Sequence, residues 1–283
     1  MIPLFLGANS RRPLPGKPAL LGVPFDGTAS FRKGTAAAPN ELRQISEDAI
    51  ETFSPRLNGD LEEFPFADLG DLSIPEKANA QDVVDLLFAK TRSLFDLDVK
   101  PLIVGGEHSI SSGAIQAAFE KHPDLHVLQF DAHADLRQDY EGDSHSHACA
   151  MRRVLDVLPS RQLLQIGIRS GTADEFAELH QTNRLLPATT DALRPRLPAP
   201  GTPIWITFDV DVFDPSECPG TGTPEAGGLT YREWEPILDL LTPHRLIGAD
   251  LVELAPILDS TGITGALGAK LIREFLILLG TKV

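Results

Sequence analysis

The chain has 283 residues, of which 42% are hydrophobic and 23% charged, a globular composition that argues against a disordered or fibrous protein. Its formal net charge of −15 argues against nucleic-acid binding and against docking on anionic membranes, since both require basic surfaces. The two cysteines, Cys149 and Cys218, form neither a CxxC motif nor a disulfide framework. We expect a cytoplasmic protein, because the first residues lack a signal pattern and no apolar run reaches the ~18 residues of a membrane span.

Short apolar runs alternate with helical patterns along the chain. Strands are predicted at residues 18–25, 66–72, 101–106, 125–130, 163–168, 203–208 and 246–252. Helices are predicted at residues 81–97, 111–122 and 264–279, with another after residue 230. The proline-rich residues 187–203 are expected to connect elements. Near-continuous apolar strands separated by helices are typical of buried parallel strands, so we predict one α/β domain over residues 1–283 with helices on both faces.

Acidic and imidazole side chains follow four of the predicted strands. These positions are Glu107-His108-Ser109, Asp131-Ala132-His133-Ala134-Asp135, Asp209-Val210-Asp211 and Glu253. Ligands of open α/β sheets bind beyond the carboxyl ends of the strands, so these side chains are candidates for a functional site. In extended backbone, alternate residues share a face. We therefore expect Asp131, His133 and Asp135 to point the same way, and Asp209 and Asp211 to do likewise.

The aspartates at this edge would repel one another unless cations lay between them. Two divalent cations would balance four carboxylates, and oxygen-rich coordination with a minority of imidazole suits Mn²⁺ better than structural Zn²⁺. The candidate metal ligands are His108, Asp131, His133, Asp135, Asp209 and Asp211. Two neighbouring ions that share one water lower its pKa and generate hydroxide, which is a nucleophile for hydrolysis.

Two further segments are candidates for the same site. His145 or His147 can shuttle a proton to a leaving amine, because histidine titrates near neutral pH, and the spacing does not choose between them. Cys149 is expected to be a small buried residue without a catalytic role. The loop at residues 214–230 is rich in Gly, Pro and Thr and is a candidate for shaping the substrate pocket.

Several ordered motifs resemble the ureohydrolase (arginase/agmatinase) family. They are GGEHS, DAHADLR, SHACAMRR, TFDVDVFDP, PGTGTPEAGGLT and GADLVELAP, and the resemblance covers nearly the whole chain. It implies a three-layer α/β/α fold with a central parallel sheet (arginase-like), a site for two Mn²⁺ ions per subunit, and a homotrimer or homohexamer. All the candidate metal ligands fall on the family's ligand positions. The family's catalytic histidine falls on His147, and its guanidinium-binding glutamate falls on Glu253.

The reaction that the resemblance implies is hydrolysis of a small cationic guanidino compound by a metal-bridging hydroxide. Asp135 would accept the hydroxide proton and pass it to the leaving nitrogen, Glu253 would hold the guanidinium, and His147 would relay a proton to the departing amine. True arginases carry a DAHxDIN-type element with a downstream Asn and Ser, whereas residues 136–142 here resemble agmatinases. We therefore predict hydrolysis of agmatine to putrescine and urea, as in polyamine biosynthesis.

Departures from the agmatinase pattern at His145, Ala173 and residues 216–218 leave the exact substrate open. Within the family, a guanidinobutyrase, an arginase or a formimidoylglutamase remain alternatives. Outside it, a catalytically silent metal-binding protein on the same fold and a single-metal, zinc-deacetylase-like hydrolase also remain. The sequence assigns no role to His145, Glu217, Cys218 or Glu225.

Overall fold

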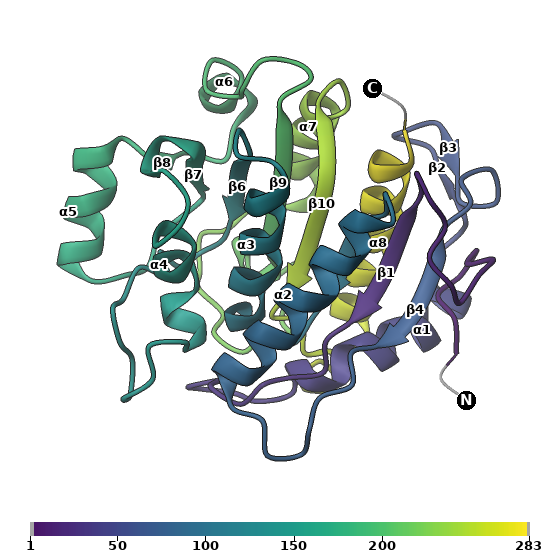
Figure 1. Cartoon of the computed structure of the whole chain (residues 1–283), viewed down its shortest axis with the longest axis horizontal. Helices are drawn as coiled ribbons and strands as arrows, with labels where there is room; N and C mark the ends of the chain where they lie inside the picture. The colour runs from purple at the N-terminus through teal and green to yellow at the C-terminus, as the bar shows by residue number, and fades with distance from the viewer. Residues whose placement is uncertain (1–2, 282–283) are drawn as a thin grey trace.

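A mixed α/β architecture is organised around one parallel sheet (Figure 1), and the computed structural model describes residues 3–281. Within that range, eight strands pair in the order β4-β1-β5-β10-β9-β6-β7-β8. They are β1 (Pro18–Gly22), β4 (Ala67–Asp71), β5 (Lys100–Val104), β6 (His126–Phe130), β7 (Leu163–Ile166), β8 (Leu185–Leu186), β9 (Pro203–Asp209) and β10 (Arg245–Val252). A separate antiparallel pair joins β2 (Phe53–Ser54) to β3 (Gly59–Asp60).

Helices cover both faces of the sheet. One face carries α2 (Ala80–Asp96), α3 (Ser111–Lys121) and α4 (Ala150–Leu155), and the other carries α1 (Ala38–Ala49), α7 (Tyr231–Leu241) and α8 (Ile263–Gly280). Figure 1 shows α2 and α3 in front of the sheet and α8 behind it. Each face of the sheet packs into its own hydrophobic core. Leu102 and Val104 of β5 contribute to the core on one face, and Ile103 contributes to the core on the other. The predicted three-layer α/β/α arrangement is confirmed.

The strand register places the ends of four strands at one level. Val252 of β10 pairs with Asp209 of β9, and Phe130 of β6 pairs with Phe208 of β9. On the other side of β10, Leu251 pairs with the last residue of β5. The polar segments that follow β5, β6, β9 and β10 therefore leave the sheet side by side, as the strand-end argument predicts.

Several elements were not predicted from the sequence. The buried side of helix α1 includes the polar residues Arg43 and Ser46, and Arg43 pairs with Asp68 at 2.8 Å and Asp71 at 2.6 Å. The helices α5 (Ala173–Thr182) and α6 (Thr190–Leu193) and the short strand β8 were also missed. The strand predicted at residues 18–25 ends earlier, at Gly22, and Pro24 has no N–H to continue a ladder.

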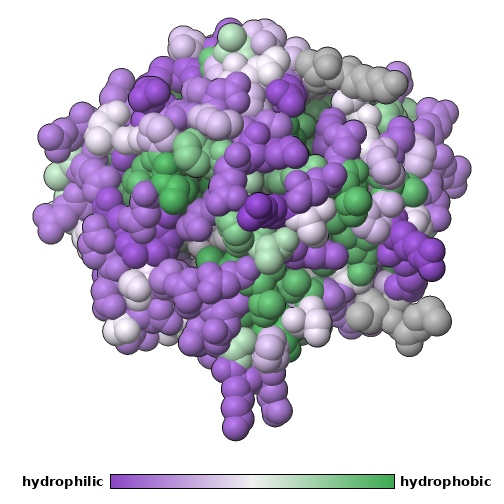
Figure 2. Space-filling model, viewed as in Figure 1, coloured by the Kyte–Doolittle hydropathy of each residue, from purple (hydrophilic) through white to green (hydrophobic). Residues whose placement is uncertain are grey.

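The face shown in Figure 2 is largely hydrophilic, with apolar residues only in scattered groups. Among residues 3–281, no helix combines the length and the apolar character that crossing a membrane requires.

Candidate metal centre

The structure brings together all the side chains that the sequence predicts as metal ligands. Two groups form, and they share Asp131: His108, Asp131 and Asp209 in one, and Asp131, His133 and Asp211 in the other. Within each group, one ligand atom from each residue lies within 4.8 Å of the others. Asp135 joins the first group, because its Oδ2 lies 2.9 Å from His108 Nδ1.

These side chains converge on one site as expected, but the backbone that delivers them is only partly extended. Asp135 has a left-handed φ of 53°, and Asp211 lies in the 3₁₀ turn η5 (Val210–Val212). Asx-type turns shape both segments instead. Asp131 Oδ1 accepts a hydrogen bond from the backbone N–H of His133 at 2.6 Å, and Asp209 Oδ1 accepts one from Asp211 at 2.9 Å.

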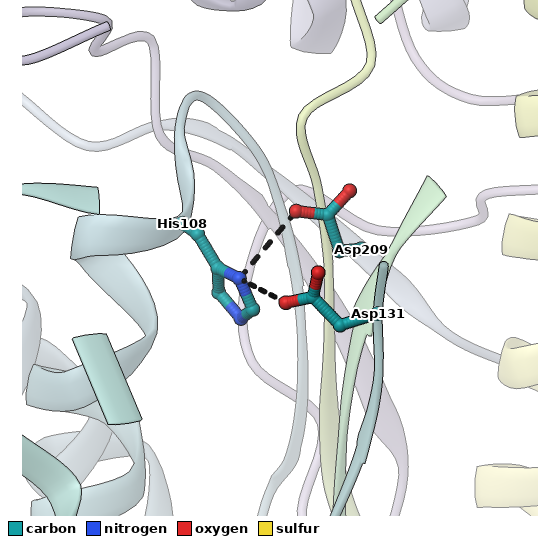
Figure 3. A group of neighbouring side chains, drawn as sticks. All are labelled: His108, Asp131 and Asp209. Carbon is teal, nitrogen blue, oxygen red and sulfur yellow. Dashed lines mark ion pairs between the residues drawn. The ribbon is translucent and has the colours of Figure 1, made fainter. Parts of the chain in front are cut away.

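His108 lies at the buried end of the centre, at the start of the 3₁₀ turn η2 (His108–Ile110) that follows β5. Its Nδ1 lies 3.0 Å from Asp131 Oδ2 and 3.5 Å from Asp209 Oδ2, and Figure 3 shows the ring nitrogen facing both carboxylates. The side chain is only 1% exposed, yet Nδ1 forms no hydrogen bond with any residue in the described range 3–281. A buried nitrogen that makes no hydrogen bond but faces several carboxylate oxygens is the arrangement that a bound cation would satisfy.

His133 lies at the open end of the centre. Its Nδ1 lies 2.9 Å from Asp211 Oδ2 and 3.7 Å from Asp131 Oδ1, and 26% of its side chain is exposed. The two segments are tied together, since the backbone N–H of Ala132 donates to Asp211 Oδ1 at 3.0 Å.

The electrostatics of the cluster also favour cations. Burial, followed by the charges of Asp211 and Asp131, raises the pKa of Asp209 well above its ordinary value. Burial and then Asp131 raise the pKa of Asp135 to about 6. Several buried carboxylates in contact are costly unless positive charge lies among them. The donor set therefore fits divalent metal ions.

A cavity of about 240 Å³ opens beside these ligands, and His147 and Glu253 line it together with His108, His133, Asp135 and Asp209. The Nε2 of His147 lies 3.2 Å from Ser30 Oγ, and its backbone N–H donates to Thr28 Oγ1 at 3.0 Å. Burial lowers the pKa of His147 to about 4, so its imidazole is neutral at pH 7. His145, the other candidate, has its Nδ1 3.3 Å from Ser144 Oγ.

Glu253 is held in a strained conformation beside His108. Its φ is 62°, in the left-handed region, and such non-glycine residues cost about 1–3 kcal/mol each and cluster at functional sites. Its backbone N–H donates to Gly106 O at 2.9 Å, and its Oε1 accepts from the His108 N–H at 2.8 Å. Burial, followed by the nearby Glu107, raises the pKa of Glu253 well above its ordinary value.

Supporting residues were missed at the sequence level. Gln129 Nε2 donates to Asp131 Oδ2 at 2.7 Å, and Thr207 Oγ1 lies 2.9 Å from His108 Nε2. The signal that would have found them is a polar residue inside an otherwise apolar predicted strand. Arg169 is a third case, since its Nη2 donates to the carbonyls of Asp211 and Glu225, both at 2.7 Å.

Two smaller expectations are met. The predicted pocket-shaping loop reaches the cavity, because Thr223 lines it and its Oγ1 lies 3.5 Å from Asp211 Oδ2. Cys149 is buried, as expected for a small core residue.

Comparison with known proteins decides the family. A sequence model of the arginase family matches residues 17–278. The chain belongs to the arginase family. This arginase-family chain is 38% identical to the agmatinase of Bacillus cereus over 267 residues, which cover 92% of this chain and 91% of that protein. It is 34% identical to the guanidinobutyrase of Pseudomonas aeruginosa over 275 residues, 92% of this chain and 86% of that one.

Solved structures agree with the arginase-family assignment. The agmatine ureohydrolase of Thermoplasma volcanium superimposes with a TM-score of 0.84 and 29% identity, over 98% of this chain and 94% of that one. The predicted resemblance, the arginase-like fold and the prediction of an agmatinase-like ureohydrolase, a hydrolase of guanidino compounds, are confirmed. Arginase-family enzymes are binuclear metal enzymes, and the two His/Asp groups described above are suited to that chemistry.

Proposed function

We propose that this arginase-family chain hydrolyses agmatine to putrescine and urea with two Mn²⁺ ions per subunit. The observation that carries the proposal is that one cavity of about 240 Å³ is lined by metal-ligand candidates, by His147 and by Glu253. A small cation suits an acidic cavity of this kind. The 38% identity to an agmatinase supports agmatine as that cation.

The metal ions would be held by the two groups that share Asp131, with Asp135 beside His108. An oxygen-rich donor set with a minority of imidazole suits Mn²⁺. When bound, the ions would lower the pKa of water, which makes that water a better nucleophile at neutral pH.

The side chains around the cavity would divide the remaining work. The Glu253 carboxylate would bind the guanidinium through charge-assisted hydrogen bonds. A carboxylate oxygen of Asp135 would take the proton released by the attacking water and pass it to the leaving nitrogen. His147 would relay a proton to the departing amine as the carbon–nitrogen bond breaks, with its Nε2 beside Ser30 at the cavity wall.

Small side chains on the cavity wall suit an aliphatic substrate chain. Ala134, Ala148 and Gly171 line the cavity and leave space for methylene groups.

A positively charged side chain on the same wall, Arg137, favours a second candidate substrate. The guanidinium of Arg137 lies 4.7 Å from the centre of the Tyr140 ring, and both residues line the cavity. A guanidino acid such as 4-guanidinobutyrate would offer Arg137 a carboxylate, and the 34% identity to a guanidinobutyrase supports that alternative.

The test is a substrate panel on the full chain loaded with Mn²⁺. We expect urea release to be fastest from agmatine, compared with arginine and 4-guanidinobutyrate, and no formamide from formimidoylglutamate. Faster turnover of 4-guanidinobutyrate would replace agmatine by the second candidate. If no compound in the panel is hydrolysed by the loaded protein, the catalytic proposal is wrong.

A pair of histidine variants tests the proposed proton relay. We expect His147→Ala to lower kcat about 100- to 10,000-fold, the usual contribution of a positioned acid or base, while the Mn²⁺ content stays unchanged. His145→Ala is the matched control and is expected to keep kcat near that of the wild type. A larger loss in His145→Ala would reverse the assignment.

Three wider predictions accompany this function. We propose that the chain forms one domain, because a single sheet takes its strands from residues 18–252. We also propose a homotrimer or homohexamer, as the family resemblance implies, which analytical ultracentrifugation would test. The cytoplasmic location stays a prediction from the sequence.

A further inference from the structure

A line of buried polar side chains runs from His108 into the interior of the sheet. The His108 Nε2 lies 2.9 Å from Thr207 Oγ1, and the Thr207 hydroxyl donates to Asp250 Oδ1 at 2.6 Å. Asp250 accepts two more hydrogen bonds, from Ser111 Oγ at 2.8 Å and from Trp205 Nε1 at 2.6 Å. All these side chains are buried, and Thr207 and Asp250 are directly paired neighbours on β9 and β10.

Counting the donors and acceptors in this line shows which atom donates in each hydrogen bond. An indole N–H can only donate and a carboxylate can only accept, so Asp250 Oδ2 is occupied by Trp205. The Thr207 hydroxyl has one proton, and it goes to Asp250 Oδ1. Thr207 Oγ1 can therefore only accept from His108, which places a hydrogen on the Nε2 of His108.

That hydrogen decides what the other ring nitrogen can do. With Nε2 protonated, a neutral His108 presents a lone pair at Nδ1, which is the atom a metal ion needs. Nδ1 lies 3.0 Å from Asp131 Oδ2 and 2.9 Å from Asp135 Oδ2. An outer partner that fixes the tautomer of a metal-binding histidine is a recurring device of metal sites, and here the partner is a carboxylate acting through a threonine.

We propose that Thr207 and Asp250 are positioning residues that hold His108 in the tautomer that binds metal. The proposal rests on the proposed metal centre and adds to it two residues that do not touch the substrate. Both side chains are fully buried in the sheet, so they act on the site only through the His108 ring.

The test measures Mn²⁺ affinity and stoichiometry on the metal-free full chain by isothermal titration calorimetry. Thr207→Val keeps the shape of the side chain and removes the hydroxyl, and we expect affinity at one of two sites to fall about 10- to 100-fold. Thr207→Ser restores the hydroxyl and is expected to bind as the wild type does. Rescue by serine separates the hydrogen bond from the packing of the side chain.

Asp250→Asn exchanges donor and acceptor along the hydrogen bonds to His108, and we expect it to lower Mn²⁺ affinity more than Thr207→Val does. The Trp205 N–H would orient the new amide with its oxygen toward the indole and its NH₂ toward Thr207. The Thr207 hydroxyl would then donate to His108 Nε2, which moves the ring hydrogen to Nδ1 and blocks the metal position. We expect a loss of affinity greater than that of Thr207→Val.

Ser111→Ala is the matched control, because it removes one hydrogen bond from the same carboxylate without touching the threonine step. We expect a lower Tm and unchanged Mn²⁺ affinity. The proposal is overturned if Ser111→Ala weakens binding as much as Thr207→Val, or if Thr207→Val binds both ions normally. If Thr207→Val does not fold, Asp250→Asn decides by the same measurement. A wild-type chain that binds no Mn²⁺ would instead refute the proposed metal centre itself.

Discussion

The two histidines of the candidate metal centre share Asp131 but have different surroundings. The His108 side chain is 1% exposed, and its outer nitrogen is bound to Thr207 inside the sheet. The His133 side chain is 26% exposed and lines the cavity. Both imidazoles line the same cavity, but that of His108 is buried and hydrogen-bonded to the sheet interior, whereas that of His133 is partly open to solvent.

This difference has an energetic consequence. Charges around His108 are shielded from water, so leaving that position without a cation costs more than at the His133 position. Water reaches His133 and can replace a lost ligand there. We therefore expect an ion held by His108 to bind more tightly and exchange more slowly than one held by His133.

The largest effect on Mn²⁺ affinity is expected from Asp131→Asn. This substitution weakens both metal positions, because both use Asp131. Asp131 Oδ2 faces His108 and Oδ1 faces His133, and the side chain is fully buried. We expect Mn²⁺ affinity to fall about 150- to 5000-fold at both positions, from ~3–5 kcal/mol for breaking a buried charge pair. Metal content after gel filtration and urea release measure the effect. Normal loading in this variant would refute the shared role of Asp131.

A smaller effect on Mn²⁺ affinity is expected when each histidine is replaced separately. We expect His133→Ala to retain one tightly bound Mn²⁺, and His108→Ala to retain one that binds about tenfold more weakly, a difference of ~1.4 kcal/mol. Equilibrium dialysis against a competing chelator measures both. Stepwise chelation of the wild type should likewise remove one ion before the other. Equal affinities in the two variants would show that burial does not distinguish the positions.

The smallest effect is expected from Gln129→Met, which keeps the approximate size of a buried side chain and removes its amide. Gln129 Nε2 donates to Asp131 Oδ2 at 2.7 Å and to the His133 carbonyl at 3.1 Å. We expect a loss of ~1–3 kcal/mol in the free energy of unfolding, measured by urea denaturation, and a weaker loss of Mn²⁺ affinity than in Asp131→Asn.

Gln165→Met is the control for Gln129→Met. Gln165 Nε2 donates to Gln129 Oε1 at 2.7 Å and to the Ala134 carbonyl at 2.9 Å, but it makes no hydrogen bond to the side chain of a candidate ligand. It should reduce stability by a similar amount and leave Mn²⁺ affinity unchanged. A drop in affinity in the control would mean that general loosening of the core, and not the bond to Asp131, controls metal binding.

The elements that carry the site were predictable because their signals are local. Apolar runs such as residues 203–208 predict buried strands, and the acidic residues directly after them mark the carboxyl edge of the sheet. The helix α1 was not predictable in this way, because Arg43 on its buried side is stabilised by Asp68 and Asp71 of β4. Its partners are 25 and 28 residues away and carry no local signal.

The sequence alone determined the candidate ligand types, their order along the chain and the edge of the sheet where they meet. It also indicated the family, since those residues lie within contiguous motifs. Only the tertiary structure decided how Asp135 and Glu253 are oriented, because both adopt left-handed backbone conformations. It also decided the hydrogen bonding of His108, since the bond from its ring to Thr207 spans 99 residues and the bond from Thr207 to Asp250 spans 43. Local patterns cannot report such contacts, because they exist only after β5, β9 and β10 have come together in the sheet.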